Sequence, residues 1–431
     1  MNTSRETHST RAPEYDVVIV GSGTSGATMA RELSAAGKKV AVLERGRYAP
    51  LNERIATILA IADEVKLGAD GLSSVRAFAA GGSSSMYFGV AENPPLQAFA
   101  AHGIDLAPEV EAVEKLLRPT PTPDTHFGVK PALLQRAAEA LGHEWRRREM
   151  LIDFAESAGG YSYDAKWKAR DFLDEAVSNG ATLIDRATVG RVMIESGRAV
   201  GVEYRAKRGF GTQTRRLHAN KVVIAAGEMA TPQILRDNGV SGIGARGFYC
   251  NPGYALYGIV PGLRGEEGFV GGSYSVIAPG IELGDANVHR VMHRLMMVGG
   301  MKLRHLFSFP DTLGIGVKVK DTLGGELRPD GRFYKTMDAG DREKLDHGRR
   351  EAIRVLEKAG AKRIVDFGLT AAGRVGGLVR IGEHIDSRFE TEIRDLHVCD
   401  GSMIPDEMRG PPAVTIVCMA RYLSKALLAA P

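Results

Sequence analysis

Three glycines near the start of the chain have the types and spacing suited to holding phosphate groups. Gly21, Gly23 and Gly26 fit the pattern GxGxxG. The first glycine permits a tight turn, the second lets a pyrophosphate approach the backbone, and the third allows close packing of helix and strand. Free N–H groups at the start of a helix, together with the helix dipole, hold the phosphates. The predicted phosphate-binding segment also includes the residues between the glycines: Ser22, Thr24 and Ser25.

Two strands and a helix must position this segment. Residues 17–20 form a β-branched run that predicts a buried parallel strand, and residues 27–36 follow with helical spacing that ends at Gly37. Residues 40–43 predict a second buried strand, which ends on Glu44. The Glu44 carboxylate can accept hydrogen bonds from ribose hydroxyls, which favours FAD or NAD over NADP. The whole context favours a dinucleotide site over a glycine-rich turn without ligand.

Three later segments also place glycine, acidic or proline residues beside predicted strands and helices. A Gly/Ser loop spans residues 81–85, and residues 222–227 read as a strand followed by Ala-Gly. Near the C-terminus a short strand ends at Asp400, and Pro411-Pro412 opens an apolar helix. A nicotinamide enzyme would continue at once with further parallel strand–helix–strand units. Because this sequence does not, the pattern counts against NAD.

Four segments together resemble the glucose–methanol–choline (GMC) family of FAD-dependent oxidoreductases. They are the glycine motif ending in LERG, the GGSSS loop, AAGEMATPQILRDNGV and LHVCDGSMIP…PPAVTI. The resemblance implies an α/β fold with a Rossmann-like, doubly wound FAD-binding domain. It also implies a smaller α+β substrate domain with an antiparallel sheet.

The same resemblance implies which residues contact FAD beyond the first motif. The backbone at Val189 would meet the adenine, and Asp400 would lie beside the ribityl–pyrophosphate. The helix after Pro412 would point its N-terminus at the pyrimidine end of the flavin, where it stabilises negative charge by about 1 kcal/mol. The remaining implied contacts are Arg45, Gly82, Ser83, Ala226, Gly227, Gly401, Ala413 and Val414.

The histidines with which family members oxidise alcohols are missing. The first, in a glycine-rich loop, aligns with Arg374, and the second histidine or asparagine, at the start of the last helix, aligns with Pro412. Neither side chain can act as a general base near neutral pH. We therefore predict catalytic roles for Arg374, Glu407 and Tyr87, with His384 as another possible base.

Three readings of the function remain open. The chain is an FAD-dependent oxidoreductase that transfers hydride from a C–H beside an alcohol or carbonyl of a small apolar or anionic substrate, more as a dehydrogenase than an oxidase. Alternatively, Arg374 serves a redox-neutral or non-alcohol reaction, as in a lyase, isomerase or decarboxylase. In the third reading the chain is an FAD-binding subunit of a redox complex. The electron acceptor is unknown; a quinone or a redox protein would serve.

Composition excludes several other classes. The net charge of +4 on 431 residues does not indicate binding to nucleic acid. No apolar run reaches the roughly 18 residues that are needed to span a bilayer. Three cysteines without a CxxC pair point to a reducing compartment, so we expect a cytoplasmic protein without an integral membrane segment. His289 and His293 have the i,i+4 spacing of a metal pair, but no further ligand completes the set and we expect no metal.

Three parts of the chain are expected from these motifs: a discontinuous FAD-binding domain, a substrate domain and a mobile N-terminal tail. Their predicted bounds are 15–99, 160–240 and 372–431 for the first, 100–159 and 241–371 for the second, and 1–14 for the tail.

Overall fold

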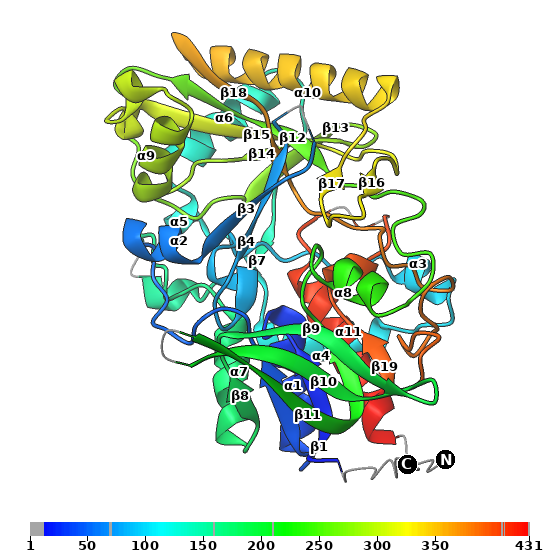
Figure 1. Ribbon diagram of the computed structural model, residues 1–431. Coiled ribbons are helices and arrows are strands. Elements are labelled where there is room, and N and C mark those ends of the chain that lie inside the picture. The colour runs from blue at the N-terminus through cyan, green and yellow to red at the C-terminus, as the bar shows by residue number, and fades with distance from the viewer. Residues whose placement is uncertain are drawn as a thin grey trace, which may run out of the picture.

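Two large sheets organise the chain, one in the lower and one in the upper half of Figure 1. The computed structural model describes residues 13–68, 71–157, 160–208, 211–406, 408 and 410–429. The predicted catalytic residue Glu407 and most of the predicted tail lie outside these residues.

The lower sheet has the strand order β8-β2-β1-β11-β10-β9, with β19 also paired to β11. Its parallel strands are β1 (Tyr15–Val20), β2 (Val40–Leu43), β8 (Thr182–Ile184), β19 (Leu396–Val398) and the second half of β11 (Gly211–Ile224). Val18 is paired with Ala41 on one side and with Val222 on the other. The strands β2 and β19 and the ends of β1 and β11 are buried on both faces, as is typical of parallel strands, whereas the edge strand β8 is partly exposed. The first half of β11 pairs antiparallel with β10 (Arg198–Arg208), which pairs with β9 (Ala187–Glu195).

Helices cover the parallel strands. The helix α1 (Thr24–Ala35) contacts both α7 (Ala169–Ser178) and α11 (Ala413–Ala429), and α11 also contacts α4 (Ala107–Leu117). The predicted first helix is confirmed, although it begins three residues earlier than the spacing indicated, and Gly37 follows it with a φ of 79°. The predicted Rossmann-like architecture is therefore present.

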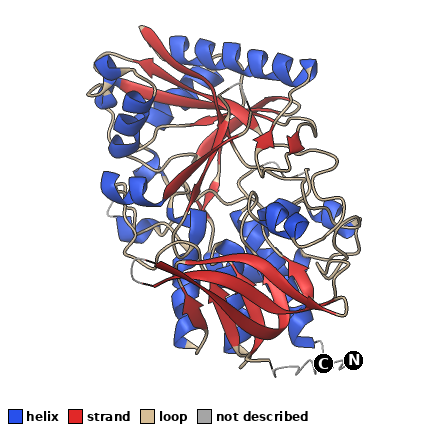
Figure 2. Cartoon of the chain, viewed as in Figure 1, coloured by secondary structure: helices blue, strands red, loops and turns tan. Residues whose placement is uncertain are grey.

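The upper sheet, drawn in red in the upper half of Figure 2, has the order β3-β4-β18-β12-β15-β14-β13-β6. Its strands are β3 (Ala62–Lys66), β4 (Ser73–Ala77), β6 (Arg146–Arg147), β12 (Pro252–Ile259), β13 (Ser273–Ala278), β14 (Ile281–Asp285), β15 (Thr312–Val319) and β18 (Arg363–Ala372). All its pairs are antiparallel except β18 with β4. The long helix α10 (Ala339–Lys358) crosses the sheet at the top of Figure 1, and Asp338 and Asp341 form its capping box.

The remaining α-helices and strands lie outside the two large sheets. They are α2 (Ile55–Ile61), α3 (Leu96–Ala100), α5 (Asp124–Phe127), α6 (Val129–Glu139), α8 (Thr231–Asp237), α9 (Arg290–Gly299), and the strand pairs β5–β7 (Thr120–Pro121 with Glu149–Met150) and β16–β17 (Glu326–Leu327 with Phe333–Tyr334). In the described part of the chain, no helix combines the length and apolarity needed to cross a membrane. The strands β3 and β4 belong to the upper sheet, although they lie within the segment 15–99 that was assigned to the FAD-binding domain. The division into domains stays a prediction.

Candidate functional site

The first glycine turn is packed so tightly that two of its positions accept only glycine. A Cβ on Gly21 would lie 2.2 Å from the carbonyl oxygen of Ala225, and a Cβ on Gly26 would lie 1.9 Å from the carbonyl oxygen of Gly21. Gly21 also has a φ of 104°. A Cβ on Gly23 would come no closer than 4.0 Å to another atom, the Cα of Gly82, so this face of the turn is open to a ligand. Gly23 is the N-cap of α1, whose first turn carries no acidic side chain and no side-chain cap.

The acid at the end of β2 is tied to this turn. One Glu44 oxygen accepts from the backbone N–H and the hydroxyl of Ser22, at 3.1 and 2.6 Å, and the other accepts from the Gly46 N–H at 2.6 Å. Burial raises the pKa of Glu44, against the lowering effect of these hydrogen bonds. Beside it, the Arg45 guanidinium stacks 4.2 Å from the Phe78 ring centre. The Glu44 carbonyl accepts from the Ala187 N–H, which brings the start of β9, and with it Val189, next to this corner.

The GGSSS loop meets the same turn. Gly82 has a φ of 60°, and a Cβ there would lie 2.7 Å from the Cα of Gly23. The Gly81 N–H donates to the Ser22 hydroxyl at 3.2 Å. Ser83 is exposed, and its hydroxyl accepts from the Ala77 N–H at 3.2 Å.

Asp400 joins two further strand ends. Its carboxylate accepts from the N–H of Gly227 at 2.9 Å, from the hydroxyl of Thr231 and from the N–H of Ser402 at 2.9 Å. The Thr231 hydroxyl in turn accepts from the Ala226 N–H. The ends of β11 and β19 are therefore held together at the edge of the sheet where α1 begins.

The last helix begins as the sequence predicts. The Pro412 carbonyl accepts from the Ile416 N–H at 2.8 Å, and α11 starts at Ala413 and Val414, both buried. Its first turn carries no acidic side chain.

These residues fit an FAD. The open face of Gly23 leaves room for a phosphate, and the start of α1 supplies donors. The Ser402 hydroxyl is buried without a hydrogen-bond partner among the described residues, and the buried Ser25 hydroxyl in α1 has only the Cys399 thiol beside it. Buried hydroxyls that lack a protein hydrogen-bond partner indicate that a ligand or a water molecule binds there.

Arg374 is buried in a loop between the two sheets. Its Nε donates to the Asn251 side chain at 3.3 Å, and its Nη2 donates to the Met408 carbonyl at 2.9 Å. The third nitrogen, Nη1, is buried and has no partner in the described chain. The guanidinium lies 4.9 Å from the Tyr249 ring centre.

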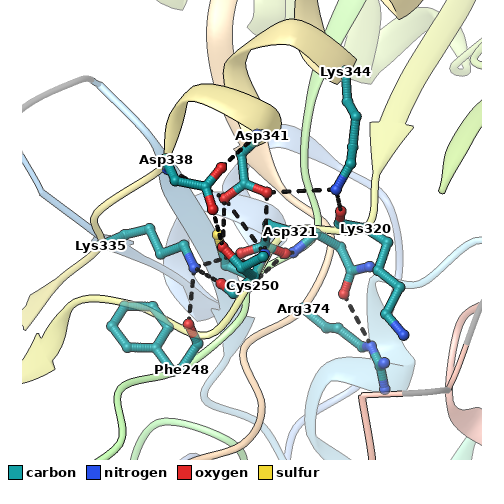
Figure 3. A network of polar contacts seen from close by, with 11 residues as sticks. Phe248, Cys250, Lys320, Asp321, Lys335, Asp338, Asp341, Lys344 and Arg374 are labelled. Atoms are coloured by element: carbon teal, nitrogen blue, oxygen red, sulfur yellow. Dashed lines mark hydrogen bonds and ion pairs between the residues drawn. The ribbon is translucent and has the colours of Figure 1, made fainter.

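A buried ion pair holds this arginine in place (Figure 3). Asp321 accepts from the N–H groups of Cys250 and Asn251 at 3.0 and 2.8 Å, and the Lys335 ammonium lies 2.6 Å from it. The side chains of Lys335 and Asp321 are 1% and 0% exposed. The pair therefore fixes the segment whose Asn251 orients Arg374.

Glu228 is a candidate site residue that the sequence analysis did not identify. Its Oε2 accepts from the Val375 N–H at 3.2 Å, and its Oε1 lies 2.5 Å from where a Cβ on Gly401 would be. Burial raises the pKa of Glu228 to about 7, the nearby Arg374 charge and the Val375 N–H lower it, and Asp400 raises it. The signal was present, because Glu228 directly follows the Ala-Gly turn after β11, as Glu44 directly follows β2.

The other predicted catalytic groups are engaged elsewhere. The Tyr87 hydroxyl donates to the Trp167 carbonyl at 2.6 Å, and burial raises its pKa. Nδ1 of His384 accepts from the Arg380 N–H, and the ring lines a surface cavity of about 470 Å³. His289 faces Glu53, whereas His293 faces Thr312, so the two histidines do not converge on one point.

Known proteins resemble this chain in sequence and in fold. The sequence model of GMC oxidoreductases matches residues 15–247. An uncharacterized GMC-type oxidoreductase of Mycobacterium tuberculosis is 32% identical over 253 residues, covering 53% of this chain but only 39% of that protein. A long-chain-alcohol oxidase of Arabidopsis thaliana is 23% identical over 95% of this chain and 67% of its own length. The crystal structure of a pyridoxine 4-oxidase from Mesorbium loti superposes with a TM-score of 0.71 at 15% identity, over 97% of this chain and all of that one.

Proposed function

Because the chain belongs to the GMC oxidoreductase family, we propose that it is an FAD-dependent oxidoreductase acting on a small molecule. The turn from Gly21 to Gly26 holds the pyrophosphate, Glu44 holds the ribose, and the Asp400 region and the start of α11 hold the flavin end. When bound, FAD supplies the acceptor for a hydride from a C–H bond beside a hydroxyl or carbonyl.

The observation that carries the chemistry is the position of Glu228 near the buried Arg374, whose charge lowers the pKa of Glu228. The free Nη1 of Arg374 donates to the substrate oxygen and stabilises negative charge that develops there. Arginine cannot accept the hydroxyl proton, but a carboxylate with a pKa of about 7 can. Glu228 therefore takes the proton that the family's histidine would take, while the C–H hydrogen leaves with its electron pair.

The same two residues favour substrates that carry negative charge or a strongly polarised oxygen. The Nη1 group of Arg374 can donate to such a substrate, because Nε and Nη2 already donate to Asn251 and to the Met408 carbonyl. A small hydroxy acid fits this requirement better than an apolar alcohol does. Electrons then pass to a quinone or a redox protein rather than to oxygen.

Anaerobic mixing of the FAD-loaded protein with matched alcohols and hydroxy acids tests the proposal. We expect bleaching of the flavin, faster with the hydroxy acids, and slowed by about 10² to 10⁴ in Glu228→Gln. Product formed while the flavin stays oxidised would instead assign a redox-neutral reaction. A matched control is Glu392→Gln, whose carboxylate is bonded to Ser241 and lies outside the Arg374 network.

A further inference from the structure

One segment in the upper half of the molecule in Figure 1 contains basic but no acidic residues. Residues 286–310 contain four Lys or Arg and no Asp or Glu. The stretch contains α9 and the loop that follows it, and α9 lies at the outer left edge of the upper sheet in Figure 1. Blocks of this kind, mixed with large apolar residues, are typical of segments that lie on membrane surfaces.

One face of α9 is anchored to the protein. Met297 is fully buried in a cluster with Tyr257 and Val365, and the His293 ring packs edge-on against Tyr257. The chain then turns at Gly300, where a Cβ would lie 2.5 Å from the Phe367 ring. The turn therefore stays close to the sheet, and the residues after it are held on a fixed support.

At the end of α9 and in the loop after it, four large apolar side chains project into solvent. Met301 is 82% exposed, Phe307 77%, Leu303 57% and Val298 51%. Met301 also has a φ of 56°, a conformation that a non-glycine residue adopts only at a cost. Single exposed apolar residues are ordinary, but four within ten positions form a patch that calls for an apolar partner.

Basic side chains surround these four residues. Arg294 lies over the Phe307 ring at 5.7 Å, and Lys302 and Arg304 alternate with Met301 and Leu303 along the chain. Arg290 is paired with Glu267 and is not counted. Arg363 of the neighbouring strand β18 acts on His305 and adds a further positive charge from another element.

We propose that this apolar-basic patch docks the protein onto a bilayer containing anionic phospholipids. The apolar tips enter the acyl boundary while the arginines and the lysine remain at the headgroups. The charge complementarity favours a negative lipid surface, because each basic residue there strengthens binding about fivefold. This surface lies on the substrate-sheet side of the molecule, and the proposal is independent of the proposed chemistry.

Vesicle sedimentation tests the patch. We expect the full chain to bind vesicles of phosphatidylcholine with phosphatidylglycerol, to bind pure phosphatidylcholine vesicles weakly, and to be released by salt. The double variant Lys302→Glu/Arg304→Glu is expected to bind at least about 25-fold more weakly. The variant Met301→Ser/Phe307→Ser is expected to lose at least about tenfold.

Matched controls separate docking from general effects. Arg215→Glu changes an exposed arginine on β11, and Val276→Ser changes a 57% exposed valine on β13; both should bind as the unchanged protein does. Circular dichroism confirms that each variant is folded. Failure to bind anionic vesicles, or equal binding by patch and control variants, overturns the proposal. So does a dimer in sedimentation velocity that Met301→Ser/Phe307→Ser abolishes, since the patch would then join two copies.

Discussion

Replacing Glu228 by glutamine should stabilise the protein at high pH. A folded-state pKa of about 7 in place of 4.5 means that the folded chain binds this proton more tightly than the unfolded chain. The stabilisation from Glu228 is therefore fully present below about pH 4.5 and is lost as the pH rises through about 7. At 1.36 kcal/mol for each pH unit, the loss amounts to about 3 kcal/mol by pH 8.

Glutamine cannot ionise, and its side-chain oxygen can still accept from the Val375 N–H, so Glu228→Gln avoids this loss. We expect the stability difference between variant and unchanged protein to grow by up to about 3 kcal/mol between pH 5 and pH 8 and then to level off. Thermal unfolding midpoints measured without substrate at constant ionic strength give the difference at each pH. Parallel curves for the two proteins across this range would refute the raised pKa and the role built on it.

A second glutamate provides a control of opposite sign. The N–H and hydroxyl of Ser241 hydrogen-bond Glu392 and lower its pKa. Its contribution is therefore present above its unfolded pKa and lost as the pH falls. Glu392→Gln should leave stability at pH 8 unchanged or lower, in contrast to the Glu228 variant.

Three further outcomes follow from the site. Arg374→Gln removes the charge that lowers the Glu228 pKa, so the pH at which substrate-driven flavin reduction is half-maximal should rise by about one unit or more, with no such rise if the two groups are uncoupled. Gly21→Ala forces a Cβ against the Ala225 carbonyl and should weaken FAD retention at least about tenfold in equilibrium dialysis; Gly190→Ala, in open space, should match the unchanged protein. Asp321→Asn leaves the Lys335 charge unpaired and should cost about 3 to 5 kcal/mol in chemical denaturation, part of which Asp321→Asn/Lys335→Met restores; an additive double variant would contradict the pairing.

The FAD-related half of the fold was the more predictable part. The strands β1 and β2 and the end of β11 are short β-branched runs, and such runs predict buried parallel strands from local sequence alone. The sequence predicts a start of α1 at residue 27 rather than at Thr24, because Thr24, Ser25 and Gly26 show no apolar periodicity. The turn at Gly21 packs against the Ala225 carbonyl just after β11, a tertiary contact that the local sequence does not indicate.

Contacts between residues far apart in the sequence limit the prediction of the upper sheet and of the proposed catalytic residues Arg374 and Glu228. The strand β4 joins that sheet through Ser73 and Ala371, and no local pattern indicates so distant a partner. Glu228 and Val375 are 147 residues apart. The role that we propose for Glu228 depends on Arg374, which precedes Val375 in the chain. The sequence aligns Arg374 with the histidine expected from the family resemblance, but only the folded chain brings the Glu228 carboxylate close to that arginine.

The most direct test of the account is the flavin content of the purified chain. After incubation with FAD and removal of free cofactor, we predict one FAD per chain, visible as flavin absorbance and released on denaturation. A folded protein that remains colourless after this treatment would contradict the claim that the glycine turn, the Asp400 strand end and the start of α11 together hold one FAD.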